Sequence, residues 1–525
     1  MVNFVISGEA GQGIESAMEM AVKTLHAMHL NVCGIPEYMS RIRGGCNSVL
    51  IKVTDEYAPY YSEKVDYCFV LDDKAYEHLK ARTEENTKFV GTEKTKGSNI
   101  YALGYIFCLL DLEADECLEF LKKSYSHIFL TSEENIERYY TGHKDANDIQ
   151  KIIITREHTL QDKKLFTGNM SQSLGAIAGG ANFISYYPMS PSTEFSTILT
   201  QFSDEFNIIS EQVEDEIAAI NMALGASYAG ARACVSTSGG GFALMSEGVS
   251  LSGMSEIPVV IHLAQRPGPA TGLPTRTAQE DLNLALYAGH GEFERILLSP
   301  SSVEDSFEIA QRAFNQAQKY QVPVFILSEQ CLLETICSTD KLTPFKNEEY
   351  LTPTPQDYKR YRLGDSPITP LAAPGFGEGL VCTISDEHDE RGRITESEQV
   401  RKEMVDKRLA KYELMVRDHL PPYFLGNSDC KKLIISWGSN FKVLKAAIKD
   451  RGDFALLHFR QLYPLDNTVL KYTEGKELII FEQNAKGQLA RLLSQEFGLK
   501  FAHKHLKYNG TPLGIEDATR FLDEI

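Results

Sequence analysis

Two carboxylates, Glu214 and Glu216, stand directly before a run of small or apolar residues at 218–230. We expect this run to form a buried helix, because a helix so rich in Ala and Gly packs closely against neighbouring backbone. Residues two positions apart on a helix face different directions, so only one carboxylate should be buried, and that one needs a polar partner. An acidic first turn that complements the helix dipole is the structural alternative. It explains Glu214 more easily than Glu216.

Three other segments carry polar or glycine-rich residues directly after predicted strands. Ligands bind at the carboxyl ends of the strands of a parallel sheet, so we expect these segments to meet at one site. A hydroxyl, a glycine loop that admits a ligand close to the backbone and an arginine suited to a carboxylate would then lie together. A plain N-capped helix start is the alternative for the first segment. The residues are Tyr187, Pro188 and Ser190 in the first segment, Ser238, Gly239 and Gly240 in the second, and Arg266 and Thr271 in the third.

A glycine-rich turn, Gly8–Gly13, follows the first predicted strand. Ile14 and Glu15 stand where a phosphate-binding P-loop requires Lys and Ser or Thr, so that motif is excluded. The glycine spacing also differs from the dinucleotide fingerprint G-x-G-x-x-G. Dinucleotide binding with Glu37 as the ribose-binding acid stays open beside a tight strand–helix turn. A second possibility is a phosphate-bearing ligand at Arg41-Ile-Arg43-Gly44-Gly45.

The chain has 525 residues, which predicts about three or four domains. Alternating strand and helix patterns predict an α/β protein with doubly wound domains at 1–155, 160–340 and 426–525. The region 341–425 is a Pro-rich linker that ends in a charged helix, Glu396–Val416. Its dense alternating charge indicates a solvated helix face.

The composition excludes several classes of protein. With 53 Lys+Arg and 72 Asp+Glu, the formal net charge is −19, which argues against nucleic acid or an anionic membrane as the main partner. The ten cysteines are scattered and form no C-x-x-C, so neither a zinc ribbon nor a ferredoxin-type cluster is expected in this chain. The first residues lack the features of a signal peptide, and no uncharged apolar run is long enough for a membrane span. We therefore expect a cytoplasmic protein.

Taken together, these motifs resemble those of the α-subunits of 2-oxoacid:ferredoxin oxidoreductases, with a γ domain fused at the N-terminus. The 2-oxoglutarate type is the most similar in domain arrangement. The resemblance implies that 1–155 is a Rossmann-like γ domain, that 160–340 binds the pyrimidine of thiamine diphosphate, and that 426–525 is a transketolase C-terminal-like domain. The segments 456–464 and 481–489 resemble the family's C-terminal motifs.

The resemblance also implies roles for single residues. Glu216 would hydrogen-bond N1′ of the aminopyrimidine and so favour the tautomer that deprotonates the thiazolium. Ser190 and Arg266 would complete the catalytic set and, with Thr271, bind the 2-oxoacid. Ser190 stands where the family motif Y-P-I-T-P has Thr, and Leu371 stands where many relatives carry an Arg, which weakens the case for a second substrate carboxylate. The remaining cofactor-binding residues would be Tyr187, Pro188, Ser238, Gly239 and Gly240.

The chain contains no Gly-Asp-Gly motif and no cluster cysteines. The resemblance therefore implies a β-type subunit that supplies the diphosphate and Mg²⁺ site and a 4Fe–4S cluster, with no metal ligands in this chain. Thiamine diphosphate would be shared between the subunits, coenzyme A would be the co-substrate and ferredoxin the electron acceptor. We expect 2-oxoglutarate as substrate, with pyruvate, branched-chain or aryl 2-oxoacids as alternatives. A nucleotide-binding regulator and a non-redox transketolase-like transferase are the alternative classes.

Overall fold

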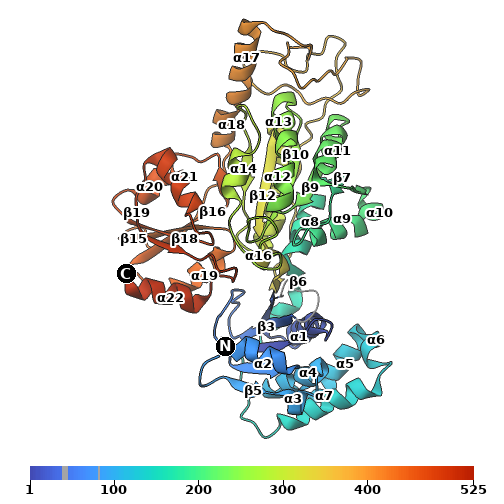
Figure 1. Ribbon diagram of the computed structural model, residues 1–525, viewed down its shortest axis with the longest axis vertical. Coiled ribbons are helices and arrows are strands. Elements are labelled where there is room, and N and C mark those ends of the chain that lie inside the picture. Colours follow the sequence, from blue (N-terminus) through green and yellow to red (C-terminus); the bar gives the residue numbers. More distant parts are fainter. Residues whose placement is uncertain (38–44, 81–82) are drawn as a thin grey trace.

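The structure is a computed structural model and describes residues 1–37, 45–80 and 83–525. It is an α/β protein with three sheets, as the sequence predicts. Figure 1 shows the first domain at one end of a long molecule, the second in the middle, and the third beside the second. An arm, residues 341–417, extends from the second domain at the other end. No helix in these described ranges is long and apolar enough to cross a lipid bilayer.

The first sheet has the strand order β5-β4-β1-β3-β2-β13-β6. It is mixed: β4 runs parallel to β1 and to β5, whereas β1, β3, β2, β13 and β6 pair antiparallel in turn. The strands are β1 (Val2–Glu9), β2 (Asn31–Glu37), β3 (Cys46–Thr54), β4 (Tyr67–Val70), β5 (Lys88–Val90), β6 (Lys164–Thr167) and β13 (Ile336–Thr339). The helices are α1 (Ile14–Ala27), α2 (Asp73–Lys80), α3 (Thr92–Thr95), α4 (Asn99–Leu109), α5 (Ala114–Ser124), α6 (Ser126–Phe129) and α7 (Glu133–Asp145).

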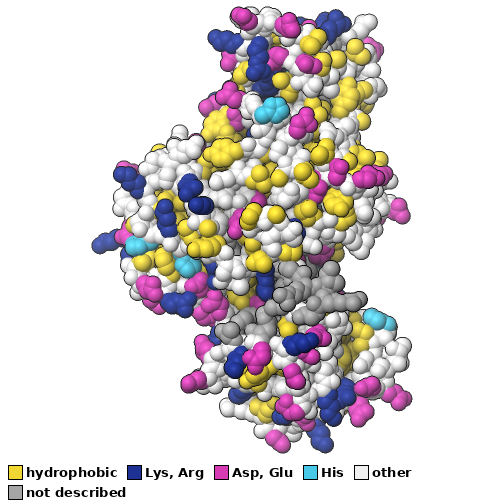
Figure 2. Space-filling view, viewed as in Figure 1, with side chains coloured by type: hydrophobic (Ala, Val, Ile, Leu, Met, Phe, Trp, Pro, Cys, Tyr) yellow, Lys and Arg dark blue, Asp and Glu magenta, His cyan; other side chains and the backbone are white. Residues whose placement is uncertain are grey.

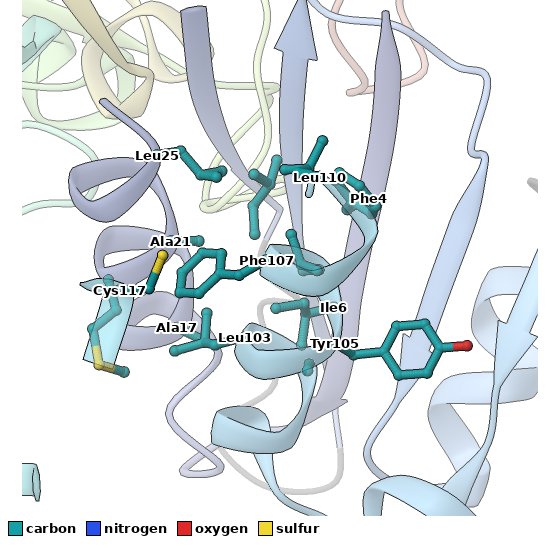
Figure 3. Close-up of a cluster of buried hydrophobic side chains, with 14 of the residues drawn as sticks. Phe4, Ile6, Ala17, Ala21, Leu25, Leu103, Tyr105, Phe107, Leu110 and Cys117 are labelled. Carbon is teal, nitrogen blue, oxygen red and sulfur yellow. The ribbon is translucent and has the colours of Figure 1, made fainter. Parts of the chain in front are cut away.

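Both faces of this sheet are covered, because successive residues of β1 enter different cores. Phe4 and Ile6 pack with α1 and α4, as Figure 3 shows for Ala21 and Phe107. Val5 faces the opposite side and joins a second core that includes residues of α2. A strand buried on both faces reads as a continuous apolar run rather than an alternating one, and the start of the chain has that pattern.

Two strands of the first sheet come from the segment predicted for the second domain. β6 and β13 pair with each other, and β13 also pairs with β2, so that Cys337 lies opposite Cys33. A short 3₁₀ helix, His158–Asp162, leads into β6. The first and second domains therefore share a sheet and are not joined by a simple linker.

The second sheet has the order β17-β11-β12-β10-β9-β7-β8, and all its pairs except β11–β17 are parallel. The strands are β7 (Phe183–Tyr186), β8 (Ile209–Gln212), β9 (Ala233–Thr237), β10 (Val259–Gln265), β11 (Ile296–Leu298), β12 (Pro323–Glu329) and β17 (Gln461–Tyr463). The helices are α8 (Gly168–Ala178), α9 (Thr193–Gln201), α10 (Ser203–Phe206), α11 (Glu216–Tyr228), α12 (Gly239–Leu244), α13 (Ser246–Ser255), α14 (Leu282–Tyr287), α15 (Val303–Tyr320) and α16 (Gln330–Glu334). The long parallel run confirms the predicted doubly wound pattern.

The third sheet has the order β14-β16-β15-β18-β19, with an antiparallel β14 at its edge. Its strands are β14 (Tyr423–Gly426), β15 (Lys432–Trp437), β16 (Phe454–Phe459), β18 (Glu477–Glu482) and β19 (Phe501–Leu506). Its helices are α19 (Asn440–Ala447), α20 (Val469–Thr473), α21 (Gln488–Phe497) and α22 (Ile515–Glu524). The C-terminal segment also contributes a strand to the second sheet, because β17 pairs with β11 at its edge.

The arm ends in α17 (Glu398–Leu409) and α18 (Lys411–Arg417). The expectation of a solvated charged face is wrong for part of this region, because Lys407 and Lys411 are buried against Glu256. Lys407 Nζ lies 2.7 Å and Lys411 Nζ 2.6 Å from the Glu256 carboxylate, and Arg360 Nη2 donates to the Glu256 carbonyl. Buried charges persist only when paired, and this cluster fastens the arm to the end of α13.

Candidate active site

The predicted site segments meet at the carboxyl ends of the central parallel strands. Ser190 follows β7, the turn Ser238–Gly241 follows β9, and Arg266 follows β10, while α11 begins just after β8. The strand order places β10, β9, β7 and β8 side by side. Segments that are far apart in the sequence therefore line one edge of the sheet, where ligands of such folds bind.

Glu216 is the first residue of α11 and is only 3% exposed, whereas Glu214 is exposed. The preceding Asp215 caps the helix by accepting a hydrogen bond from Ala218 N at 2.7 Å. This division of roles confirms that only one of the two predicted carboxylates is buried. Glu216 Oε1 is shielded from solvent and has no hydrogen-bond partner. A buried acceptor without a partner is costly, so this atom suits a donor on a bound ligand.

The glycine turn lies directly against Glu216. A Cβ atom at Gly241 would overlap both Glu216 Oε1 and Thr237 Oγ1, whereas a Cβ at Gly240 would meet only Ala270 O, at 3.7 Å. Ser238 is fully buried, and its Oγ has no hydrogen-bond partner. The backbone at Gly240 is therefore open, and two unsatisfied polar atoms, Glu216 Oε1 and Ser238 Oγ, lie beside it. This combination fits the polar edge of a planar ring.

Replacing Gly241 by alanine is expected to weaken binding of the thiamine diphosphate that the sequence resemblance implies by about 5- to 150-fold. The added methyl group must displace Glu216 or Thr237, and a buried ligand donor that loses its acceptor Glu216 costs about 1–3 kcal/mol of binding free energy. The dissociation constant, measured by calorimetry on the complex with the partner subunit, checks the prediction. Gly452→Ala is the matched control, because an added Cβ there meets nothing within 4 Å. Equal affinities in the two variants would contradict the placement of the turn.

Ser190 and Arg266 are brought together. Arg266 Nη1 donates to the Ser190 carbonyl at 2.5 Å, and burial lowers the pKa of Arg266 while the nearby Asp281 charge opposes that shift. Tyr187, three residues before Ser190, is 40% exposed, and Thr271, five residues after Arg266, is also exposed. A partly buried guanidinium at the mouth of a polar site is suited to bind the carboxylate of a small ligand.

Sequence reasoning missed two polar residues of this site, Gln265 and Asp281. Asp281 N donates to Gln265 Oε1 at 3.2 Å, and both Gln265 Nε2 and Asp281 Oδ2 are shielded without partners. Burial raises the pKa of Asp281 to about 7; Glu280 adds to the increase and Arg266 opposes it. A polar residue at the last position of a largely apolar strand, directly before Arg266, was the available signal for Gln265. Nothing in the spacing marks Asp281.

The neighbouring His262 is a structural residue. It is fully buried, its Nδ1 lies 2.7 Å from Ser236 Oγ, and its ring stacks on Phe195. Burial lowers the pKa of His262 to about 3. The imidazole is therefore neutral at physiological pH, and its ring packs the first turn of α9 against the sheet.

The third domain braces the loop between Arg266 and Asp281. Gln279 N donates to Gln483 O at 2.8 Å, and Gln483 N donates to Gln279 Oε1 at 2.9 Å. Gln279 Nε2 donates to Trp437 O and to Glu329. The C-terminal segment that sequence analysis singled out at 481–489 thus holds the site loop from behind.

The glycine turn Gly8–Gly13 is filled by the protein's own side chains. Gln12 Oε1 accepts a hydrogen bond from Glu9 N at 2.8 Å, and Asn99 Nδ2 donates to Gly13 O at 2.8 Å. A Cβ at Gly8 would overlap Gln12. This packing favours the tight-turn interpretation over a nucleotide site. Arg41, Arg43 and Gly44 lie outside the described residues.

Leu371 does not lie at this site. It forms a β-bridge with Leu351, whose side chain packs near Gly230, just beyond the carboxyl end of α11. Glu216 begins that helix, so a rise of 1.5 Å per residue separates the two ends by about 20 Å. Within this chain, Leu371 therefore lies far from Glu216. Among the described residues, no group of three or more His, Cys, Asp or Glu side chains is placed to hold a metal ion.

Two family models match this chain, one in the first domain and one over the second domain and the arm. Residues 3–105 match "Pyruvate ferredoxin/flavodoxin oxidoreductase", and residues 174–407 match "Pyruvate flavodoxin/ferredoxin oxidoreductase, thiamine diP-bdg". The second match contains Glu216, the glycine turn and Arg266. The region that matches the thiamine diphosphate-binding model therefore contains the unsatisfied polar atoms of Glu216, Ser238, Gln265 and Asp281.

Known proteins agree with these matches. Subunit alpha of 2-oxoacid:ferredoxin oxidoreductase 1 from Sulfurisphaera tokodaii is 31% identical over 503 residues, which cover 91% of this chain and 79% of the relative. The 2-oxoglutarate synthase subunit KorA of Methanocaldococcus jannaschii is 31% identical over 325 residues, 60% of this chain and 87% of its own. The solved 2-oxoglutarate:ferredoxin oxidoreductase of Magnetococcus marinus, with 2-oxoglutarate, coenzyme A and succinyl-CoA bound, superimposes with a TM-score of 0.93 at 28% identity, covering 100% of this chain and 99% of that one. The chain therefore belongs to the α-subunits of the 2-oxoacid:ferredoxin oxidoreductases.

Proposed function

We propose that this chain forms the pyrimidine-binding half of a thiamine diphosphate-dependent active site that oxidises 2-oxoglutarate with coenzyme A. The products would be succinyl-CoA, CO₂ and reduced ferredoxin. The observation that carries the proposal is Glu216 Oε1, a buried carboxylate oxygen without a partner beside a turn that tolerates no side chain at Gly241. The choice of 2-oxoglutarate rests on the names of the relatives, and pyruvate, branched-chain and aryl 2-oxoacids are the alternatives.

Thiamine diphosphate, when bound, supplies the carbanion chemistry that lets a 2-oxoacid lose CO₂. Glu216 would hold and return a proton at N1′ of the aminopyrimidine, because its Oε1 is the unsatisfied acceptor at that edge. The burial of this carboxylate strengthens such a hydrogen bond. Ser238 Oγ and the backbone at Gly239 and Gly240 would fix the plane of the ring. Tyr187 and Pro188 would bound the other side.

Arg266 would orient the substrate carboxylate, with Ser190 and Thr271 beside it. Replacing Arg266 by alanine is expected to raise KM for the 2-oxoacid by about 10- to 150-fold, since a hydrogen bond to a charged group is worth about 1.5–3 kcal/mol. KM of Arg266→Lys should fall between those of the unmodified enzyme and Arg266→Ala, because lysine keeps the charge without the planar guanidinium. Steady-state kinetics checks this, and an unchanged KM in Arg266→Ala would discard the role.

A second subunit is part of the proposal. Most residues of α11 are apolar on every side of the helix, yet Ile217 is 50% and Met222 41% exposed, and Leu244 of α12 is 53% exposed nearby. A helix that is apolar all round is normally buried. Hydrophobic and uncharged side chains also dominate the centre of the face in Figure 2, whereas charged ones gather on the arm and the other two domains. A β-type subunit on such surfaces would supply the diphosphate and Mg²⁺ site and the 4Fe–4S cluster.

The decisive experiment is reduction of benzyl viologen by this chain co-expressed with its β-type partner, over a panel of 2-oxoacids with and without coenzyme A. Reduction that depends on coenzyme A is the expected result, fastest with 2-oxoglutarate. A complex loaded with thiamine diphosphate and iron that reduces viologen with none of the panel would overturn the proposal. Absence of iron from the purified complex would favour the non-redox transferase instead.

A further inference from the structure

Asp281 lies inside the site, and the function described above gives it no role. The backbone N–H of Asp281 donates to Oε1 of Gln265, the residue before Arg266. Its carboxylate packs against the glycine turn so closely that a Cβ at Gly239 would overlap both oxygens. Asp281 therefore contacts the turn on one side and the strand end that carries Arg266 on the other.

The polar atoms around Asp281 are unsatisfied. Asp281 Oδ2 and the amide nitrogen Nε2 of the fully buried Gln265 are both shielded from water, and neither has a hydrogen-bond partner. Asp281 directly precedes α14 but makes no capping hydrogen bond to it. A carboxylate that neither caps its helix nor forms an ion pair, next to an amide with a free N–H, marks a place where a ligand completes the hydrogen bonding.

Two charged groups act on this carboxylate among the described residues. Arg266, at the end of β10, attracts it, and Glu280, the preceding residue in the same loop, repels it. The helices that pack nearby contribute neutral groups, Gly239 from α12 and Gln488 from α21, whose Nε2 donates to Glu280 O at 2.7 Å. Asp281 is thus balanced between one cation and one anion in a poorly hydrated setting.

We propose that Asp281 sets the charge of the substrate pocket: it offsets Arg266 in the free enzyme and takes up a proton from solvent when a substrate carboxylate binds Arg266. This inference rests on the proposed function, because it needs an anionic 2-oxoacid at Arg266. Binding cancels the attraction that keeps Asp281 ionised and brings a second negative charge close to it. Proton uptake removes that repulsion, and the resulting carboxylic acid can donate a hydrogen bond to the substrate.

The sign of the pH dependence follows directly. Because burial raises the pKa of Asp281 to about 7 in this chain, the group is largely protonated at pH 6, and binding takes up almost no proton there. Above pH 7 each bound substrate requires a proton, so KM should rise with pH, by at most about ten-fold per unit. The turnover number should not follow the same profile, because the substrate complex is already protonated.

The test uses the complete complex with the partner subunit and the best 2-oxoacid of the panel. We expect KM of the unmodified enzyme to be flat below pH 6 and to rise above pH 7, and KM of Asp281→Asn to be flat throughout, with similar kcat profiles. Glu280→Gln is the matched control. It should keep the rise but shift it to lower pH, because Glu280 raises the pKa of Asp281.

A second measurement needs neither turnover nor a variant. Calorimetric titration with oxamate, an anion with a carboxylate next to a carbonyl, in buffers of different ionisation enthalpy counts the protons taken up. About one proton at pH 8 and none at pH 6 is expected for the unmodified complex. No uptake at pH 8, or an equal rise of KM in Asp281→Asn, would overturn the inference. Absence of viologen reduction with every 2-oxoacid would instead overturn the proposed function, and the oxamate titration would still decide the role of Asp281.

Discussion

Replacing Glu216 by glutamine is expected to lower viologen reduction by about 10²- to 10⁴-fold, the range of a lost general acid–base group. Glu216 is buried and begins α11, and its Oε1 lies against the glycine turn without a hydrogen-bond partner among the described residues. Glutamine fills the same volume, so packing against Gly241 and Thr237 is preserved. An amide cannot take and return a proton, however, so the loss should fall on kcat rather than on KM.

The matched control is Glu214→Gln, since Glu214 is exposed two residues away. Its turnover should stay within about two-fold of the unmodified enzyme, as expected for a surface substitution. Size-exclusion chromatography and thiamine diphosphate binding should show an intact complex for both variants. If Glu216→Gln turned over normally while Glu214→Gln did not, the assignment would pass to Glu214.

Replacing Glu256 by glutamine is expected to destabilise the protein by about 3–5 kcal/mol, the cost of breaking a buried ion pair from one side. Glu256 is the anion that pairs with Lys407 and Lys411, and its backbone carbonyl accepts from Arg360. The three cations hold the pKa of the carboxyl well below its usual range, although burial alone would raise it. Glutamine would leave all three positive charges in the interior without a counter-charge.

The readout is the thermal or urea midpoint of unfolding, together with limited proteolysis of the arm. Glu413→Gln in α18 is the control, because Glu413 is exposed and its loss should change the midpoint little. Because the folded-state pKa of Glu256 is lowered, its stabilising contribution is present above the unfolded pKa near 4.5 and is lost as pH falls far below it. A midpoint of Glu256→Gln equal to that of Glu413→Gln would show that the cluster does not hold the arm.

The elements around the site were predictable from local pattern. The strand ends that carry Ser238 and Arg266 lie beside each other, as expected for segments that follow the strands of a parallel sheet. Glu216 was identifiable because carboxylates two positions apart at the start of a helix face different directions, so only one of the pair could be buried. These features depend on hydrophobic periodicity, which is local in the sequence, and on the general rule that ligands bind at the carboxyl ends of parallel strands.

The features that escaped prediction depend on contacts between distant segments. The charges of the arm read as solvated because Glu256, their partner, is about 150 residues earlier. Asp281 is an ordinary loop residue until the fold places Gly239 and Gln265 against it. The strands β6 and β13 carry no signal that assigns them to the first sheet rather than the second.

The shared first sheet has a consequence for how the chain is made. β2 becomes an interior strand only when β13 pairs with it, and β13 leaves the ribosome 246 residues after the end of β5 at Val90. At roughly 5–20 residues per second, the unpaired edge of β2 is exposed for tens of seconds during synthesis. The N-terminal domain therefore cannot finish folding during translation until the second domain has almost emerged. A chain released early would present an open strand edge of the kind that pairs with other chains and aggregates.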